Sequence, residues 1–327
     1  MTAVLDTVVT SDTVAESTPS LASWPARAGA FAIDVLLGAA VLATMAVSAW
    51  SAPWLGWLWW VFVGTAACVF VAMAVNRLLL PTITGWSLGR AVFGIAVRTG
   101  DGPAPGVLRL VGRDLVHLGD TAALFVGWLW PLWDGRNRTF ADLALRTEVH
   151  VVDRDVERAQ RDMRRPAAVA LIVATVLCAA AVGLSYLVVY RPERAVDVAR
   201  QQIAEQGPRI VEQILSYNSE TLQQDFSRAQ SLTTDNYRDQ LIAQQQLIGQ
   251  SGATSNEYWA VSSAVLSATA QKASMLVALQ GQRGTDPKDL KFITATLRVE
   301  FEKSADGQWK VANLIVLKKP QMNVPGQ

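Results

Sequence analysis

Long runs of apolar residues that carry almost no charge are the feature that most constrains the fold of this chain. Residues 28–50 contain one charged side chain, Asp34, and residues 54–75 and 166–190 contain none. A helix needs about 20 such residues to cross the roughly 30 Å hydrocarbon core of a bilayer. The three runs therefore predict three membrane-spanning helices. The short break at residues 51–53 joins the first two as a tight hairpin.

The composition of the 327 residues agrees with a membrane protein. Hydrophobic residues make up 51% and charged residues 17% of the chain, whereas soluble proteins average about 25% charged residues. Lys and Arg number 29 and Asp and Glu 28, so no basic surface for nucleic acid is indicated. Cys68 and Cys178 lie in apolar runs and no residue cluster has metal-ligand spacing, so we expect no disulfide framework, no metal and no other cofactor.

The ends of the hairpin carry their own signals. Residues 1–23 are polar and contain acids but no Lys or Arg, which predicts a disordered tail rather than a signal peptide. Tryptophan, which favours the headgroup level of a bilayer, clusters around the break between the two runs. These residues are Trp50, Trp54, Trp57, Trp59 and Trp60.

The next stretch of chain decides the topology. Residues 76–117 and 134–165 are both rich in arginine, which favours the cytoplasmic side of a membrane. The apolar segment between them, residues 118–133, is short and interrupted by Gly119, Asp120 and Pro131. We therefore expect a re-entrant or interfacial segment, with a single crossing as the alternative. The N-terminus would then be cytoplasmic, and the span 166–190 would lead to the outer side.

Residues 191–327 have the patterns of a water-soluble α+β domain. Helical spacing of apolar residues continues from residue 193 to about 250. Residues 292–302 alternate between apolar and polar side chains, which predicts a strand with one buried face. Asp306 and Gly307 then form a turn into a partner strand at 309–317, and two earlier strands are expected near 259–270 and 274–280.

Three stretches of the membrane half resemble the RDD family of membrane domains. They are residues 27–34 (RAGAFAID), residues 87–97 (SLGRAVFGIAV) and residues 138–144 (RTFADLA) followed by Thr147. The resemblance covers about residues 20–152 and implies two firm spans. It also implies an arginine, Arg27, at the mouth of the first span and an aspartate within it. The family has no settled activity, and transport is only a suggestion for it.

The remainder resembles the Mce-associated membrane proteins of mycobacteria and related actinobacteria. The resemblance rests on residues 196–202, which follow the span, and on residues 216–221 (SYNSET), 232–238 (LTTDNYR) and 306–311 (DGQWKV). The resemblance implies one span and an extracytoplasmic α+β domain of cystatin-like or nuclear-transport-factor-like shape. It also implies work beside Mce complexes, which import lipids or sterols through the cell envelope.

Asp34 is the strongest candidate for a functional residue, because a carboxylate within a span costs about 2.5–3.5 kcal/mol on insertion scales. Arg27 lies seven residues earlier on the same helical stripe, about 10 Å along the axis. We hypothesise that Arg27, Asp34 and Asp142 form a polar network that locks the two spans to the cytoplasmic loop. An ion or proton path through Asp34 is the alternative.

Two further patterns are weaker. His117 and Asp120 are three residues apart on one helical face and would form either a proton relay or a satisfied interfacial pair. Residues 85–89 (GWSLG) match the nucleophile elbow of hydrolases, but that chemistry needs a strained turn, a histidine base and an oriented acid beside the serine. We therefore expect no enzyme.

The sequence as a whole predicts a multi-pass protein of the plasma membrane that is a non-enzymatic accessory of a Mce-type lipid importer. The expected partners are the permease and substrate-binding subunits of the Mce complex and membrane lipids. A transporter of ions or small solutes with Asp34 as its coupling group is the alternative. The predicted parts are a tail (1–23), an RDD-like membrane domain (24–152), a basic cytoplasmic linker (153–165), a span (166–190) and an extracytoplasmic α+β domain (191–327).

Overall fold

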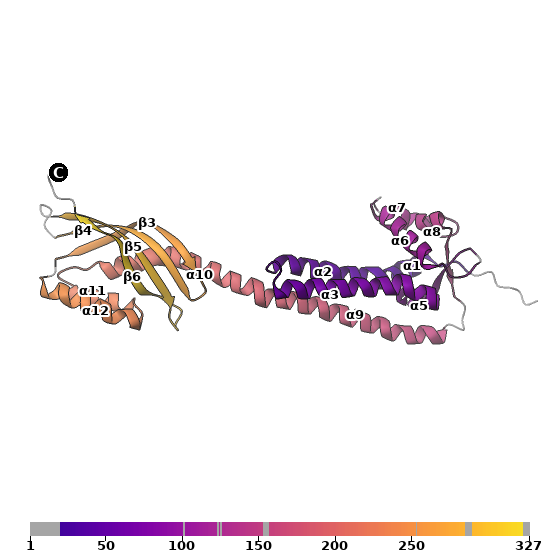
Figure 1. Ribbon diagram of the computed structural model, residues 1–327, viewed down its shortest axis with the longest axis horizontal. Helices are drawn as coiled ribbons and strands as arrows, with labels where there is room; N and C mark the ends of the chain where they lie inside the picture. The colour runs from indigo at the N-terminus through magenta and orange to yellow at the C-terminus, as the bar shows by residue number, and fades with distance from the viewer. Residues whose placement is uncertain are drawn as a thin grey trace, which may run out of the picture. The chain divides into compact units, whose positions relative to one another are not determined.

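The computed structural model of the chain consists of two compact units, one ending at Ser185 and the other beginning at Tyr186 (Figure 1). It describes residues 20–100, 102–122, 124, 126–152, 157–252, 254–284 and 290–322. Most of the predicted tail, residues 1–19, lies outside the described residues. The predicted fold class, a helical membrane region followed by an α+β domain, is confirmed.

The first unit is built on a hairpin of two long helices. The first helix runs through α1 (Trp24–Phe31), a π-helical turn η1 (Ala32–Leu36) and α2 (Leu37–Ser51). The second runs through α3 (Trp57–Ala74), a π-helical turn η2 (Val75–Leu79) and α4 (Leu80–Thr84). Each has 28 residues, long and apolar enough to span a membrane, as predicted. Asp34 lies in one π-helical turn and Asn76 in the other.

A third long helix, α9 (Glu157–Ser185), packs against α2 and α5. Its apolar part belongs to a continuous helical stretch, Met163–Leu215, which is the third candidate span among the described residues. Residues 157–165 of the predicted linker form the first part of this helix. Residues 153–156 of that linker lie outside the described residues.

Short elements gather at the open end of the hairpin (Figure 1). They are α5 (Leu88–Phe93), β1 (Ile95–Arg98), α6 (Val107–Ala122), α7 (Val126–Leu129), the 3-10 turn η3 (Trp130–Leu132), α8 (Phe140–Leu145) and β2 (Glu148–Val151). The segment expected to begin at residue 118 is thus part of α6, which begins eleven residues earlier, at Val107. The first half of α6 has buried polar residues, so a search for apolar runs does not detect it. A bend of 109° separates α6 from the helical piece Val126–Leu132, the geometry of a broken span or a re-entrant loop.

The two strands β1 and β2 pair antiparallel, from Ile95 opposite Val151 to Arg98 opposite Glu148. The segment before α1 joins this ladder, because the Ala22 N–H donates to the Val149 carbonyl at 2.8 Å and Ala22 is fully buried. Residues 20–23 are therefore part of the fold rather than of a disordered tail. Since β1 precedes and β2 follows the α6–α7 segment, both ends of that segment lie on one side of the unit.

The described residues of the second unit form three α-helices and one four-stranded antiparallel sheet. The helical part consists of a π-helical turn η5 (Tyr186–Tyr190), α10 (Arg191–Leu215), α11 (Leu222–Ser231) and α12 (Asp235–Gln250). The sheet has the order β3-β4-β5-β6, with β3 (Asn256–Ala268), β4 (Lys272–Arg283), β5 (Lys291–Lys303) and β6 (Trp309–Met322). The helix α10 packs across the sheet against β3, β4 and β6.

The core of the second unit lies between α10 and the inward faces of the strands. Alternate residues of β4 and β5 are buried, as the period-two pattern predicts. Val211 of α10 is fully buried with Val277 and Val299 of the sheet. The turn before β6 places Gly307 at a φ of 83°, a left-handed conformation that favours glycine.

Candidate functional site

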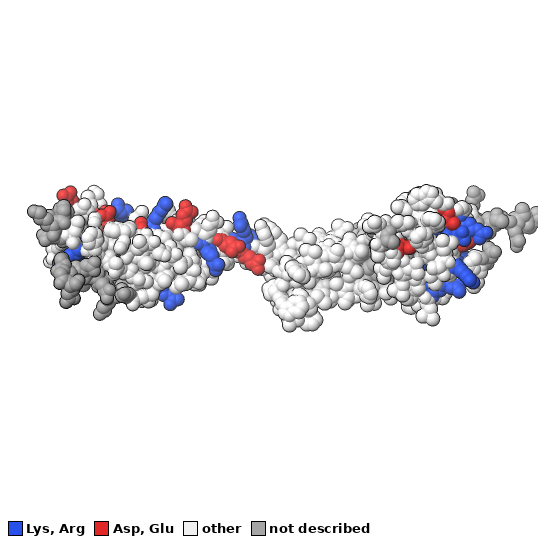
Figure 2. All heavy atoms as spheres, turned by 90° about the horizontal axis from the view of Figure 1, so that it is seen from above, with Lys and Arg blue, Asp and Glu red and all other residues white. Residues whose placement is uncertain are grey.

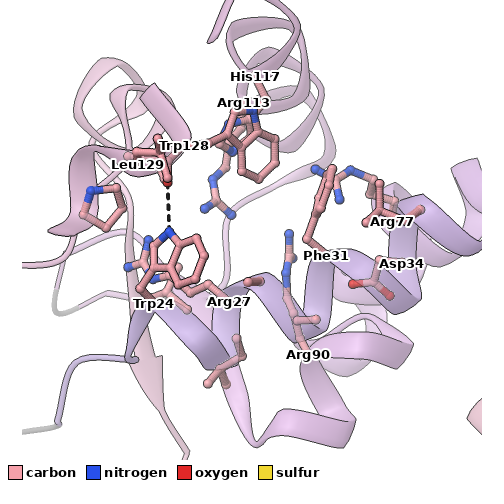
Figure 3. A pocket seen from close by; sticks show the side chains of 17 residues that line it. Trp24, Arg27, Phe31, Asp34, Arg77, Arg90, Arg113, His117, Trp128 and Leu129 are labelled. Carbon is pink, nitrogen blue, oxygen red and sulfur yellow. Dashed lines mark hydrogen bonds between the residues drawn. The ribbon is translucent and has the colours of Figure 1, made fainter. Parts of the chain in front are cut away.

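A cavity of about 370 Å³ lies at the open end of the hairpin, where α1, η1, η2, α5, α6 and α7 meet (Figure 3). Four arginines line it, Arg27, Arg77, Arg90 and Arg113, and we call it the arginine cavity. Figure 2 shows charged side chains gathered at this end of the first unit, while the neighbouring stretch of its visible surface has none. The arginine cavity thus lies at the charged end of the unit.

Asp34 is buried at one side of the arginine cavity and is held by three donors. The Asn76 amide donates to Oδ1 at 2.8 Å and the Gly89 N–H donates to the same oxygen at 2.7 Å. The Ser87 hydroxyl donates to Oδ2. These donors come from the second long helix and from the start of α5, so the carboxylate ties both to the first long helix.

Asp142 is the centre of a second polar cluster and is fully buried. Its two oxygens accept from Arg27 at 2.7 Å and from Arg113 at 2.8 Å. Thr139 and Thr147 complete the site, since the Thr139 N–H and the Thr147 hydroxyl also donate to the carboxylate, at 3.1 and 3.0 Å. Burial by itself would raise the pKa of Asp142, but the positive charges of Arg113 and Arg27 hold it well below its usual range.

The other two arginines differ in how their charges are compensated. Arg77 forms a bidentate pair with Asp114, with N–O distances of 2.6 and 2.7 Å. Arg90 is buried and has no ion pair among the described residues. Burial, followed by the like charges of Arg113 and Arg77, lowers the pKa of Arg90 to about 9, so it remains a cation at neutral pH.

Several buried guanidinium nitrogens of these arginines lack a hydrogen-bond partner among the described residues. They are Nε and Nη2 of Arg27, Nη1 of Arg90 and Nε of Arg113. Buried donors are almost always satisfied in proteins, because an unmade hydrogen bond leaves the full cost of desolvation. The first unit therefore concentrates unused donors of positive charge around one cavity.

Aromatic side chains form the opposite wall. Trp128 lies against Phe31, with ring centroids 4.3 Å apart, and stacks on His117 at 4.2 Å. The Trp24 indole N–H donates to the Trp128 carbonyl at 3.1 Å (Figure 3). The His117 Nδ1 lies 3.2 Å from Asp120 Oδ2. This pair is in contact, as the spacing predicts, but its role as a relay stays a prediction.

The structure divides the predicted network of Arg27, Asp34 and Asp142 into two clusters. Arg27 and Asp142 are in direct contact, whereas the hydrogen bonds of Asp34 lead to Asn76 and to the start of α5. Sequence reasoning missed Arg90 and Arg113 as members of the site. The spacing of Leu110, Arg113, His117 and Asp120, all buried on one face of α6, is the signal that would have found the second of these.

The GWSLG stretch is accounted for by the fold. Ser87 is fully buried and precedes α5, and its hydroxyl donates to Asp34. A nucleophilic serine needs a histidine base and an exposed hydroxyl. The hydrogen bond of Ser87 to a carboxylate at a helix start is instead a structural contact.

Comparisons with known proteins give one family match and several likenesses to solved structures. No curated protein matches the sequence. Solved structures with a likeness include an IcmL-like type IV secretion system protein of Legionella pneumophila (12% identity, 39% of this chain and 96% of that chain, TM-score 0.31). A second is CagV, a VirB8 homolog of a type IV secretion system of Helicobacter pylori (10% identity, 35% of this chain and 95% of that chain, TM-score 0.29). A third is a proposed aromatic ring hydroxylase of Novosphingobium aromaticivorans (14% identity, 38% of this chain and 92% of that chain, TM-score 0.27). Residues 21–146 match the RDD family, which confirms that resemblance for the membrane unit.

Proposed function

We propose that the protein is a non-enzymatic accessory subunit of a Mce-type lipid or sterol importer in the cell envelope. Its RDD unit would anchor it among the membrane subunits, and its α+β unit would contact the substrate-binding subunits. The Mce-associated motifs behind the third span and the match of residues 21–146 to the RDD family support this proposal.

The observation that carries the accessory role is the way in which Asp34 is used. A coupling carboxylate must exchange its ion or proton during each transport cycle. Asp34 instead accepts hydrogen bonds from Asn76, Ser87 and Gly89, which fix the first long helix to the second and to α5. The intramembrane charge is thus used to hold the unit together.

The α+β unit offers a surface suited to a protein partner along β3, an edge strand of the sheet. Between Tyr258 and Ala270 this region has no charged residue. Val261 is 59% and Leu266 49% exposed, and the ladder with β4 skips both residues, so each is a β-bulge. Bulges re-aim side chains at sheet edges. The bulges disfavour pairing with a further strand, and the Ala260 N–H already donates to Glu212 at 2.6 Å. The exposed apolar side chains of Val261 and Leu266 instead favour side-chain contact with an apolar surface of a substrate-binding subunit.

Photo-crosslinking from β3 tests the assembly role. A crosslinking amino acid at Val261 of the full chain in its native membrane is expected to capture a substrate-binding subunit of the Mce complex. The same amino acid at Leu247 on α12, another exposed apolar residue, is the matched control and is expected to capture none. If Val261 captures no Mce subunit, the proposed function is wrong.

A second measurement separates the accessory from the transporter. Asp34→Asn is expected to lower the amount of folded protein, because it removes the anionic acceptor that ties three segments together. Purified wild type in liposomes is expected to carry no proton-driven solute flux. Flux that Asp34→Asn abolishes while the protein level stays unchanged would favour the transporter.

A further inference from the structure

We propose that the arginine cavity binds a phosphate group between the guanidinium groups of Arg90, Arg113 and Arg27. The phosphate of an anionic phospholipid and free phosphate share this chemistry, and the shape of the cavity favours the lipid. The proposal is independent of the Mce assignment, because it uses only residues of the first unit.

The first argument is charge. Four guanidinium groups line the arginine cavity, and the carboxylates that line it or pair with them are Asp34, Asp114 and Asp142. Arg27 and Arg113 share a single carboxylate, and Arg90 has no ion pair among the described residues. Asp120 is buried beside the cavity as well, but it pairs with His117, so a further anion is needed where Arg90 lacks a partner.

The second argument is geometry. Figure 3 shows Arg113 reaching into the cavity from α6 and Arg90 reaching toward it from α5, with Arg27 beside them. All three carry buried nitrogen atoms without a partner in the described parts of the chain. A carboxylate offers its two oxygens in one plane, whereas a phosphate offers oxygens in several directions. Donors that converge from separate helices therefore fit a phosphate, which arginine forks recognise well.

The third argument is the position of the cavity along the spans. Its lining includes Leu36, a residue of the first long helix whose surface is 54% exposed. Trp24, Phe31 and Trp128 extend the apolar wall from there to the arginines. A charged floor that continues into an exposed apolar face of a span suits a phospholipid, whose headgroup enters the cavity and whose acyl chains remain in the bilayer.

Two measurements on the full chain in detergent test the proposal. Native mass spectrometry measures ligand binding, and a thermal unfolding experiment measures the melting temperature with and without ligand. The probes are dioctanoyl phosphatidylglycerol, inorganic phosphate and dioctanoylglycerol, which lacks the phosphate. Phosphatidylglycerol is expected to bind and to raise the melting temperature, and dioctanoylglycerol to do neither. If inorganic phosphate binds as tightly as phosphatidylglycerol, the cavity is a phosphate site, but its ligand is free phosphate rather than a phospholipid.

Arg90→Met distinguishes a binding residue from a structural one. It is expected to weaken phosphatidylglycerol binding by about tenfold, the value of one charge-assisted hydrogen bond. It should leave the ligand-free melting temperature unchanged or higher, because an apolar side chain replaces an unpaired buried charge. Arg109→Met, at an exposed position of α6, is the matched control and is expected to keep wild-type affinity.

Arg90→Lys is the second variant, in case the methionine variant does not fold. Lysine keeps the positive charge but lacks the planar guanidinium group that donates two parallel hydrogen bonds. We therefore expect weaker binding of phosphatidylglycerol and an unchanged ligand-free melting temperature. Wild-type affinity in both Arg90 variants, or equal binding of dioctanoylglycerol, would overturn the proposal.

Discussion

At the scale of single residues, the membrane unit depends on one close approach of backbones. The start of α5 lies against the first long helix, and a Cβ at Gly89 would lie 2.3 Å from the Ala30 carbonyl oxygen and 2.9 Å from Cγ of Asp34. Only glycine allows this approach, which lets the Gly89 N–H donate to Asp34. The GWSLG motif thus carries a packing requirement rather than a catalytic one.

Gly89→Ala is therefore expected to destabilise the protein by about 1–3 kcal/mol, the usual cost of overpacking. The added methyl group would push α5 away from Ala30 and break its hydrogen bond to Asp34. The check is the melting temperature of the full chain in detergent. Gly64→Ala on α3 is the control, because no described atom lies within 4 Å of its added Cβ. Equal melting temperatures for the two variants would contradict the role of Gly89.

The two arginines on Asp142 predict a dependence on pH. They hold its pKa in the folded protein below its unfolded value of about 3.9. A depressed pKa stabilises the fold above the unfolded value, and this contribution is lost as the pH falls through the folded value. Asp142→Asn is expected to cost about 3–5 kcal/mol at neutral pH, because two buried charges lose their partner.

The melting temperatures of wild type and Asp142→Asn should therefore differ most at neutral pH. The difference should begin to shrink near pH 4 and decrease further as the pH falls toward the depressed pKa of the folded protein. Glu220→Gln, which removes an exposed acid from the second unit, is the control and is expected to follow wild type throughout. A constant difference between wild type and Asp142→Asn down to low pH would show that the charge of Asp142 is not what stabilises the unit.

At the scale of elements, the sequence predicts those helices and strands whose pattern is contained within one segment. The apolar runs locate both helices of the hairpin, and the alternation in residues 292–302 locates β5, because each pattern repeats over many residues. The strands β1 and β2 have four residues each and are missed. Strands this short become defined only by pairing across some fifty residues, which no local period reports.

The candidate site follows the same division. Asp34 stands out locally, because charge within an apolar run is costly and needs a reason. Arg27 and Asp142 stand out through the stretches that resemble the RDD family. Arg90 and Arg113 look like two more loop arginines in the sequence. The polar stripe of α6 could have pointed to Arg113, but the convergence of α5 and α6 on one cavity, which brings Arg90 and Arg113 together, becomes visible only in three dimensions.

At the scale of the whole molecule, the pairing of β1 with β2 limits the membrane topology. Glu148 and Arg98 lie opposite one another in the ladder, one after and one before the α6–α7 segment. Arg113 of α6 is also bound to Asp142 of α8. A single crossing between these strands would put them on opposite sides of the bilayer, where they could not pair. The pairing therefore favours a segment that returns to the side from which it entered.

With a returning segment, three candidate spans remain among the described residues, and we predict that the residues before the first and after the third lie on opposite sides of the membrane. The arginines at the open end of the hairpin favour the cytoplasm for that end. Alkaline phosphatase, which is active only outside the cytoplasm, is expected to be active when fused after Gln327. It should be inactive when fused after Gly100 or Gly135, which flank the returning segment. Activity after Gly135 together with inactivity after Gln327 would show that the segment crosses the membrane. The α+β unit would then lie in the cytoplasm, where it could not reach the proposed substrate-binding partners.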